Sequence, residues 1–354
     1  MNLLKEALAG IQPPDDACAA QAGLRLDSLT KPRGSLGRLE EIVRRYAAIR
    51  RDPEARMNAG AVCVFVADHG VAREGVSAYP QAVTVEMLRN IAGGGAAISV
   101  LARRLSYRLL IADVGVVTDT SGCPIPGVLY RRIAPGTRNF AAEKAMSLAQ
   151  AEAALEAGLN VAREAIASGA TLLGIGEMGI ANSTSAAALL SALTGLSPAT
   201  IAGRGAGVDD AGLRRKVEVI ERALALHRAS LADPLATLAA LGGFEIAAMA
   251  GACLGGAAFT VPVVVDGFIA TAAAVVAERL SPGLFAHLFF GHRSSEGGHG
   301  LVLERLGVKP IVDLEMRLGE GSGAALAMNV VESALALFRE MATFTSAGVS
   351  EKLE

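Results

Sequence analysis

Residues 171–190 read Thr-Leu-Leu-Gly-Ile-Gly-Glu-Met-Gly-Ile-Ala-Asn-Ser-Thr-Ser-Ala-Ala-Ala-Leu-Leu. The stretch begins with a short apolar run, Thr171–Ile175, which is typical of a buried strand. Glycines and one carboxylate follow, and then an Ala/Leu pattern that is typical of a helix. A strand that passes through a glycine-rich turn into a helix is the repeating unit of α/β proteins.

The same transition recurs along the chain. The runs that read as buried parallel strands are Ala61–Ala67, Arg108–Ala112, Thr171–Ile175, Val261–Val265, Leu284–Phe290 and Pro310–Leu314. Helical patterns lie between most of them. We therefore predict an α/β fold of three layers, in which helices cover both faces of a parallel sheet of about six strands.

Polar or glycine-containing clusters follow these runs. They are Asp68-His69-Gly70, Asp113-Val114-Gly115, Gly176-Glu177, Asp266-Gly267, Gly291-His292-Arg293-Ser294-Ser295 and Gly319-Glu320. In an open parallel sheet, ligands bind outside the carboxyl ends of the strands. We expect the clusters to share one rim, which would be the ligand site.

The two ends of the chain differ from the middle. Pro13-Pro14 and Lys31-Pro32-Arg33-Gly34, together with several charges, suggest helices joined by loops. We predict a small helical domain made of residues 1–58 and 340–354, and a large α/β catalytic domain made of residues 59–339.

Composition excludes several classes of function. The 354 residues carry a net charge of −2, no Trp and 4% aromatic residues, which argues against nucleic-acid binding. The N-terminus lacks the apolar core of a signal peptide. Four scattered cysteines without a CxxC pair suit a reducing compartment, so we predict a cytoplasmic protein. They are Cys18, Cys63, Cys123 and Cys253.

One stretch raises the question of a membrane. Ile246–Val265 contains no charged residue over twenty positions, which is long enough to cross a bilayer. However, Gly255-Gly256 and Pro262 interrupt it, and its end is β-branched. We interpret it as a buried helix followed by a central strand, with a membrane span as the minor alternative.

Three glycine-rich or polar loops are candidates for ligand contact. Gly174–Ser185 opens a helix, where free N–H groups favour an anion, although Asn182 or Ser183 could be only a cap. Gly203–Gly207 precedes a helix that carries Lys216 and could form a phosphate nest or a flexible surface loop. Gly291–His299 could be a polar ligand loop or a structural turn, and its two histidines fit zinc spacing poorly.

Two further segments carry candidate chemistry. Glu320 stands among glycines in Arg317–Gly323, where a strand would pass into a helix, and a carboxylate held there is a candidate general base. Asp68-His69-Gly70 leads towards Ser77 and Gln81, which could hydrogen-bond a ring nitrogen. No Gly-x-Ser-x-Gly elbow follows a strand, so acyl transfer is disfavoured.

Together these segments resemble the nicotinate-nucleotide:dimethylbenzimidazole phosphoribosyltransferase family of cobalamin lower-ligand synthesis. The resemblance runs through nearly the whole chain. The segments that carry it are Lys31–Gly37, Ala67–Val71, Gly174–Gly179, Gly242–Glu245, Val265–Gly267, His292–Ser294 and Leu318–Gly323. One departure is Ala181, where relatives often carry glycine, and its methyl group is expected to narrow that turn.

The resemblance implies transfer of ribose 5-phosphate from nicotinate mononucleotide to 5,6-dimethylbenzimidazole, without metal or cofactor. It implies a Rossmann-like large domain, a homodimer, and Glu320 as general base with Glu177 close by to support or replace it. The implied benzimidazole contacts are Ser77, Gln81, Met178 and Leu318. The implied phosphate contacts are Gly176, Gly205, Lys216 and Ser294, with Asp266 near the nucleotide.

Two other functions remain open from the residues alone. A binding protein of the same fold could hold a nucleotide or benzimidazole without turnover, but carboxylates at the rim are a costly way to hold an anion. A dinucleotide-dependent oxidoreductase is disfavoured, because the first strand ends in Asp68-His69-Gly70 and not in GxGxxG.

Overall fold

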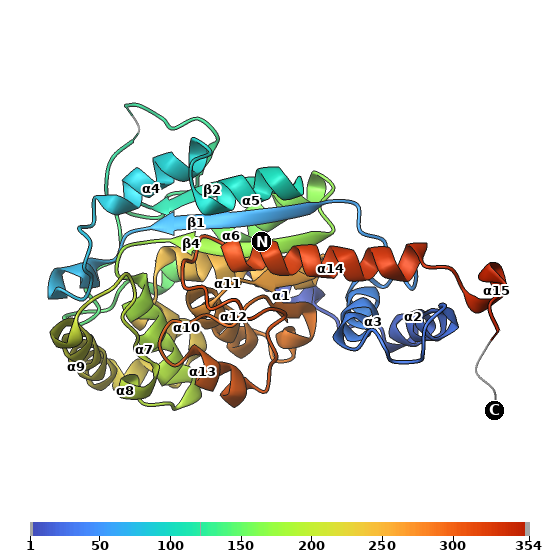
Figure 1. The fold of residues 1–354 in the computed structure, drawn as a ribbon. Helices are drawn as coiled ribbons and strands as arrows, with labels where there is room; N and C mark the ends of the chain where they lie inside the picture. The colour runs from blue at the N-terminus through green and yellow to red at the C-terminus, as the bar shows by residue number, and fades with distance from the viewer. Residues whose placement is uncertain (1–2, 121, 351–354) are drawn as a thin grey trace.

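The computed structural model describes residues 3–120 and 122–350, and within them the strands form one six-stranded parallel sheet (Figure 1). The spatial order is β3-β2-β1-β4-β5-β6. The strands are β1 (Gly60–Ala67), β2 (Arg108–Gly115), β3 (Val128–Tyr130), β4 (Leu172–Met178), β5 (Val263–Val265) and β6 (Leu288–Phe290). The predicted α/β class with a parallel sheet is confirmed.

Helices cover both faces of this sheet. The main ones are α4 (Val83–Ala92), α5 (Ala97–Leu105), α6 (Leu148–Ala167), α7 (Asn182–Thr194), α9 (Asp210–Leu226), α10 (Pro234–Leu241), α11 (Phe244–Ala258), α12 (Phe268–Leu280), α13 (His299–Leu306) and α14 (Ser322–Glu340). Short helical turns are η1 (Gly70–Glu74), α8 (Pro198–Ile201), η2 (Arg228–Ser230) and η3 (Leu284–His287).

The alternation of side chains along β1 separates two apolar cores. Cys63 and Phe65 face a core shared with α6, α7, α10, α11 and α12. Val62 and Val64 face the opposite core, shared with α4, α5 and α14. Successive side chains of a strand point to opposite faces, so a strand buried on both sides is apolar throughout.

Two strand predictions need correction. In Leu284–Phe290 only the last three residues are a strand, because the first four form the helical turn η3. The Glu278 carboxylate holds this turn by accepting the N–H groups of Gly283 and Phe285. Pro310–Leu314 is not a strand of the sheet. It forms one isolated bridge, between Val312 and His292. Proline has no N–H to donate to a ladder.

Helices α6 and α11 approach so closely that their backbones touch. A Cβ atom added at Gly158 would lie 1.7 Å from the carbonyl oxygen of Ala248, and one added at Gly251 would lie 1.9 Å from that of Leu155. The interpretation of Ile246–Val265 as a buried helix followed by a strand is therefore confirmed. Among the described residues no helix combines the length and apolarity that a bilayer crossing requires.

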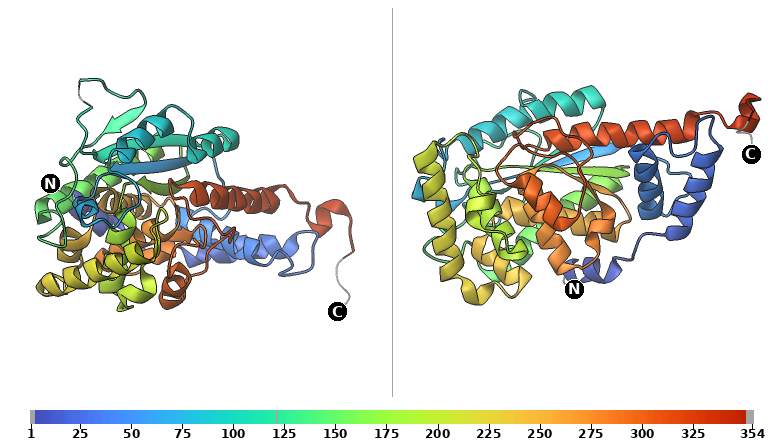
Figure 2. Two further views of the ribbon diagram at one scale, coloured as in Figure 1. Left: turned by 60° about the vertical axis from the view of Figure 1, so that its left-hand side comes forward. Right: turned by 60° about the horizontal axis from the view of Figure 1, so that its bottom comes forward.

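The terminal helices are α1 (Leu3–Gly10), α2 (Asp16–Ser28), α3 (Arg38–Arg50) and α15 (Phe344–Ala347). Helices α2 and α3 lie beside the C-terminal end of α14 (Figures 1 and 2), where Thr30 N–H donates to the Ala342 carbonyl at 2.9 Å. Helix α1 instead packs on the main body, with Leu4 in the core next to α6 and α11. The division into two domains stays a prediction.

Candidate active site

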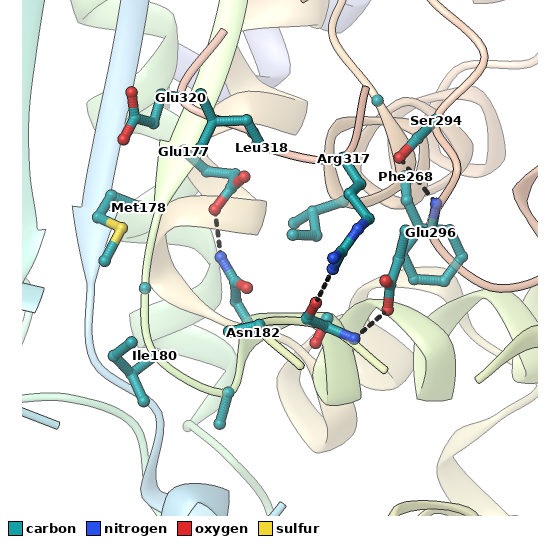
Figure 3. A pocket seen from close by; sticks show the side chains of 18 of the residues that line it. Glu177, Met178, Ile180, Asn182, Phe268, Ser294, Glu296, Arg317, Leu318 and Glu320 are labelled. Carbon is teal, nitrogen blue, oxygen red and sulfur yellow. Dashed lines mark hydrogen bonds between the residues drawn. The ribbon is translucent and has the colours of Figure 1, made fainter. Parts of the chain in front are cut away.

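A pocket of about 410 Å³ lies at the carboxyl ends of β4, β5 and β6. Glu177, Asp266, His292 and Glu320 line it, so four of the six polar clusters that follow the predicted strands meet here. The apolar part of the lining includes Met178, Ile180, Phe268 and Leu318 (Figure 3). The lining therefore combines apolar side chains with several carboxyl groups.

Glu320 stands on a strained backbone. Its φ is +63°, between Gly319 at +85° and Gly321 at +82°. A non-glycine residue in this region costs on the order of 1 kcal/mol and is often found at functional sites. The loop rests directly on β4, because a Cβ atom at Gly176 would lie 2.1 Å from the nitrogen of Gly321. The close approach explains the glycine at position 176.

The Glu320 carboxyl group is buried, with 5% of the residue exposed, and it lines the pocket. Burial raises its pKa and the charge of Asp266 adds to this, while a hydrogen bond from the Ile98 backbone opposes it. Its Oε2 atom has no hydrogen-bond partner among the described residues. A carboxylate with a free lone pair and a raised pKa is well suited to accept a proton.

Glu177 lies at the end of β4, and its backbone carbonyl accepts the N–H of Glu320 at 3.2 Å. The side chain of Asn182 donates to its carboxyl group, as Figure 3 shows. Burial raises the pKa of Glu177 to about 8, helped by the charges of Glu245 and Asp266 and opposed by Asn182. At neutral pH Glu177 is therefore mostly protonated.

Asp266 follows β5 and binds the start of helix α14. Its two oxygens accept the N–H groups of Gly321 at 3.1 Å and Ala324 at 2.7 Å. His292 lies close by, with Nε2 3.8 Å from Asp266 Oδ1. Burial raises the pKa of Asp266, and His292 and the backbone donors oppose this. Asp266 thus fixes the backbone on the C-terminal side of Glu320.

Three of the four predicted benzimidazole contacts line the pocket, and one does not. Ser77, Met178 and Leu318 line the pocket, and Leu318 is 55% exposed at its mouth. Gln81 does not line it, because its amide donates to the backbone carbonyl of His69 at 3.2 Å. The side chain of the same His69 forms a buried pair with Glu245, with Nε2 2.6 Å from Oε1.

The predicted phosphate contacts also divide. Gly205 and Ser294 line the pocket, whereas Gly176 lies beneath the 319–321 loop. Lys216 is buried behind the lining, where its Nζ donates to Ser183 Oγ at 2.8 Å and to the Gly203 carbonyl at 2.9 Å. Burial lowers the pKa of Lys216 to about 8, and the nearby Glu296 opposes this.

The assignment of roles from sequence omitted several side chains of the lining, among them Phe268, Glu296 and Arg317. Glu296 and Arg317 belong to segments whose polarity was noted, but nothing in the sequence showed which way they point. Over residues 3–120 and 122–350, no three His, Cys, Asp or Glu side chains are grouped as metal ligands would be.

Comparison with known proteins places this site in context. Residues 11–349 match the model of a family described as phosphoribosyltransferase. Curated nicotinate-nucleotide–dimethylbenzimidazole phosphoribosyltransferases from Chloroflexus aggregans and Roseiflexus sp. RS-1 are 51% and 50% identical over 354 residues, covering all of both chains. A crystal structure of the enzyme of that name from Thermus thermophilus has a TM-score of 0.89 and 48% identity, covering 96% of this chain and 100% of that one.

Proposed function

Because the chain belongs to the phosphoribosyltransferase family that matches residues 11–349, we propose roles in its reaction for the residues of the pocket. The reaction transfers ribose 5-phosphate from nicotinate mononucleotide to 5,6-dimethylbenzimidazole. The products are α-ribazole 5′-phosphate and nicotinate. The C–N bond to nicotinate breaks, a new bond forms from an imidazole nitrogen to the anomeric carbon with inversion, and the second imidazole nitrogen loses its proton.

The leaving group needs little help from the protein. The pyridinium nitrogen of the donor carries a positive charge that is neutralised as nicotinate departs, so no acid is required there. The anomeric carbon gains positive charge in the transition state, which nearby carboxylates stabilise. Alignment of two small molecules for in-line attack supplies a further large part of the acceleration.

Glu320 is the proposed general base. The observation that carries this role is its position: a buried carboxyl group in the pocket lining, on a strained turn, with an oxygen that has no hydrogen-bond partner among the described residues. As the new C–N bond forms, the imidazole N–H becomes acidic and a carboxylate can take the proton. Glu177 lies beside Glu320 and is mostly protonated. It is therefore neutral, and it supports Glu320 without placing a second negative charge next to it.

The remaining lining divides by polarity. The apolar side chains of Met178, Ile180 and Leu318 hold the flat benzimidazole ring, and Ser77 in the lining offers a hydroxyl group to it. The polar end around Gly205 and Ser294, with Lys216 behind it, holds the phosphate of the donor. Asp266 contributes by fixing the turn that carries Glu320.

Glu320→Gln tests the base. We expect a fall in kcat of about 10²- to 10⁴-fold, with nicotinate release followed by chromatography. Glu304→Gln, at an exposed position on α13, is the matched control. Wild-type turnover by Glu320→Gln would remove Glu320 from the mechanism. Tight binding of both substrates by the unmodified protein without nicotinate release would favour the alternative of a non-catalytic binding protein.

The family resemblance also supports a homodimer in the cytoplasm and the two-domain division described above. Sedimentation equilibrium at several protein concentrations tests the dimer.

A further inference from the structure

The polar end of the pocket is built around the peptide group of Gly205. Its N–H donates to Glu296 Oε1 at 2.7 Å, and its carbonyl accepts Arg317 Nη1 at 3.2 Å (Figure 3). Ser183 Oγ lies on the third side, 2.8 Å from where a Cβ atom of residue 205 would be. Gly205 is thus held between an anion and a cation.

Lys216 brings a buried positive charge to the same place. Its side chain is 1% exposed, and two of its three N–H groups are accepted by Ser183 and Gly203. Among the described residues its partner in charge is Glu296, whose Oε1 lies 3.9 Å from Nζ, too far for a hydrogen bond. A buried ammonium group needs a compensating anion, and Glu296 supplies it in this structure.

The backbone around Glu296 is fixed. Its N–H donates to Ser294 Oγ at 3.1 Å, and Gly298 N–H donates to the Ile201 carbonyl at 3.2 Å. A Cβ atom at Gly297 would lie 2.5 Å from that same carbonyl oxygen. Because the backbone is packed against the 201–203 segment, any movement of the carboxylate away from Gly205 must come from its side chain.

A backbone N–H from a glycine-rich loop, an ammonium group and nearby hydroxyl groups are the donors that commonly bind phosphate. Here the Gly205 N–H donates to a carboxylate of the protein, Glu296, and the Lys216 ammonium group lies 3.9 Å from the same oxygen. We propose that Glu296 is an internal anion that competes with the substrate phosphate for Gly205 and Lys216. The inference rests on the proposed function, which places the donor phosphate at this end of the pocket.

In this competition, phosphate is expected to displace Glu296. A phosphate dianion has more charge and more acceptor oxygens than one carboxylate, so it displaces Glu296, but the displacement weakens its net affinity. The same effect acts on the phosphorylated product. Glu296 thereby lowers the affinity for both the phosphorylated substrate and the phosphorylated product. The affinity for dimethylbenzimidazole is unchanged.

Glu296→Gln separates this role from a structural one, because the amide oxygen still accepts the Gly205 N–H while the charge is lost. We expect the Kd of inorganic phosphate, measured by calorimetry, and the KM of nicotinate mononucleotide to fall by about tenfold, which corresponds to ~1.4 kcal/mol. The KM of dimethylbenzimidazole is expected to stay constant. An unchanged or raised phosphate Kd in Glu296→Gln would overturn the proposal.

Two further variants keep the test decisive. If Glu296→Gln does not fold, Glu296→Asp, which keeps the charge but retracts it from Gly205, should lower the phosphate Kd to a smaller extent, and a rise there also overturns the proposal. Lys216→Ala should weaken phosphate binding at least tenfold. Unchanged phosphate binding in Lys216→Ala would instead show that the phosphate site proposed above is elsewhere.

Discussion

The carboxylate of Asp266 accepts the backbone N–H of Gly321 at 3.1 Å, at the residue that directly follows Glu320. Its other oxygen accepts the N–H of Ala324 at 2.7 Å, so one side chain both caps helix α14 and fixes the left-handed turn before it. A carboxylate at a helix N-terminus is favoured by the helix dipole. Asp266 therefore links the β5 strand to the position of the proposed base.

Asp266→Asn should disturb this link. The amide group turns one acceptor into a donor, which leaves a buried N–H unsatisfied and costs about 1–3 kcal/mol. We expect a lower free energy of unfolding in urea and a kcat at least about tenfold below wild type, because Glu320 loses its fixed position. Asp313→Asn, at an exposed surface pair with Arg293, is the control. A destabilised variant with wild-type kcat would refute the positioning role.

Ala181→Gly should stabilise the protein. Ala181 is the N-cap of helix α7, with φ at +75°. This conformation costs a residue with a Cβ atom about 1–2 kcal/mol, which glycine avoids. Part of this stabilisation is offset because glycine has more conformational freedom in the unfolded chain. We expect the free energy of unfolding to rise by about 0.5–1 kcal/mol. Ala186→Gly, inside the same helix, should lower it by about 1 kcal/mol or more. Equal destabilisation by both changes would contradict the strain argument.

Glu177 makes stability depend on pH. Because burial raises its pKa from 4.5 to about 8, the protonated form is the one the fold prefers. Its contribution is complete below pH 4.5 and is lost as the pH rises through 8. The free energy of unfolding of wild type relative to Glu177→Gln should therefore fall between these values, by more than ~2 kcal/mol. Urea titrations at several pH values measure it, and a rise with pH would reverse the assignment.

The sheet could be predicted from sequence where strands are long and central. Strands β1 and β4 are buried on both faces, and their apolar runs stand out. Strand β3 was missed because its three residues at the sheet edge are only half-buried and carry no clear pattern. Pro310–Leu314 was misassigned because its apolar sequence resembles that of a strand. It is instead a loop held by Arg38, which donates to the Pro310 carbonyl, and by the Ile311 N–H, which donates to the Phe290 carbonyl of β6.

The site could be predicted at the level of segments. The rule that ligands bind beyond the carboxyl ends of parallel strands correctly placed Glu177 and Asp266 together. Glu320 joins them although the segment before it, Pro310–Leu314, is not a strand of the sheet. Side-chain direction lies beyond that rule: Gln81 turns to the His69 carbonyl, and Lys216 is enclosed by Ser183 and Gly203. Such contacts depend on tertiary packing that no local pattern encodes.

The backbone contact between α6 and α11 has a consequence for hydropathy profiles. Not even a methyl group fits at Gly158 or Gly251 where the two helices touch, so the contact requires glycine at these two positions. The uncharged run Ile246–Val265 thus reflects burial within the protein: all residues of α11 from Phe244 to Ala257 are buried. In a chain rich in small residues, the length of an uncharged run is therefore weaker evidence for a bilayer segment than the glycines that interrupt it.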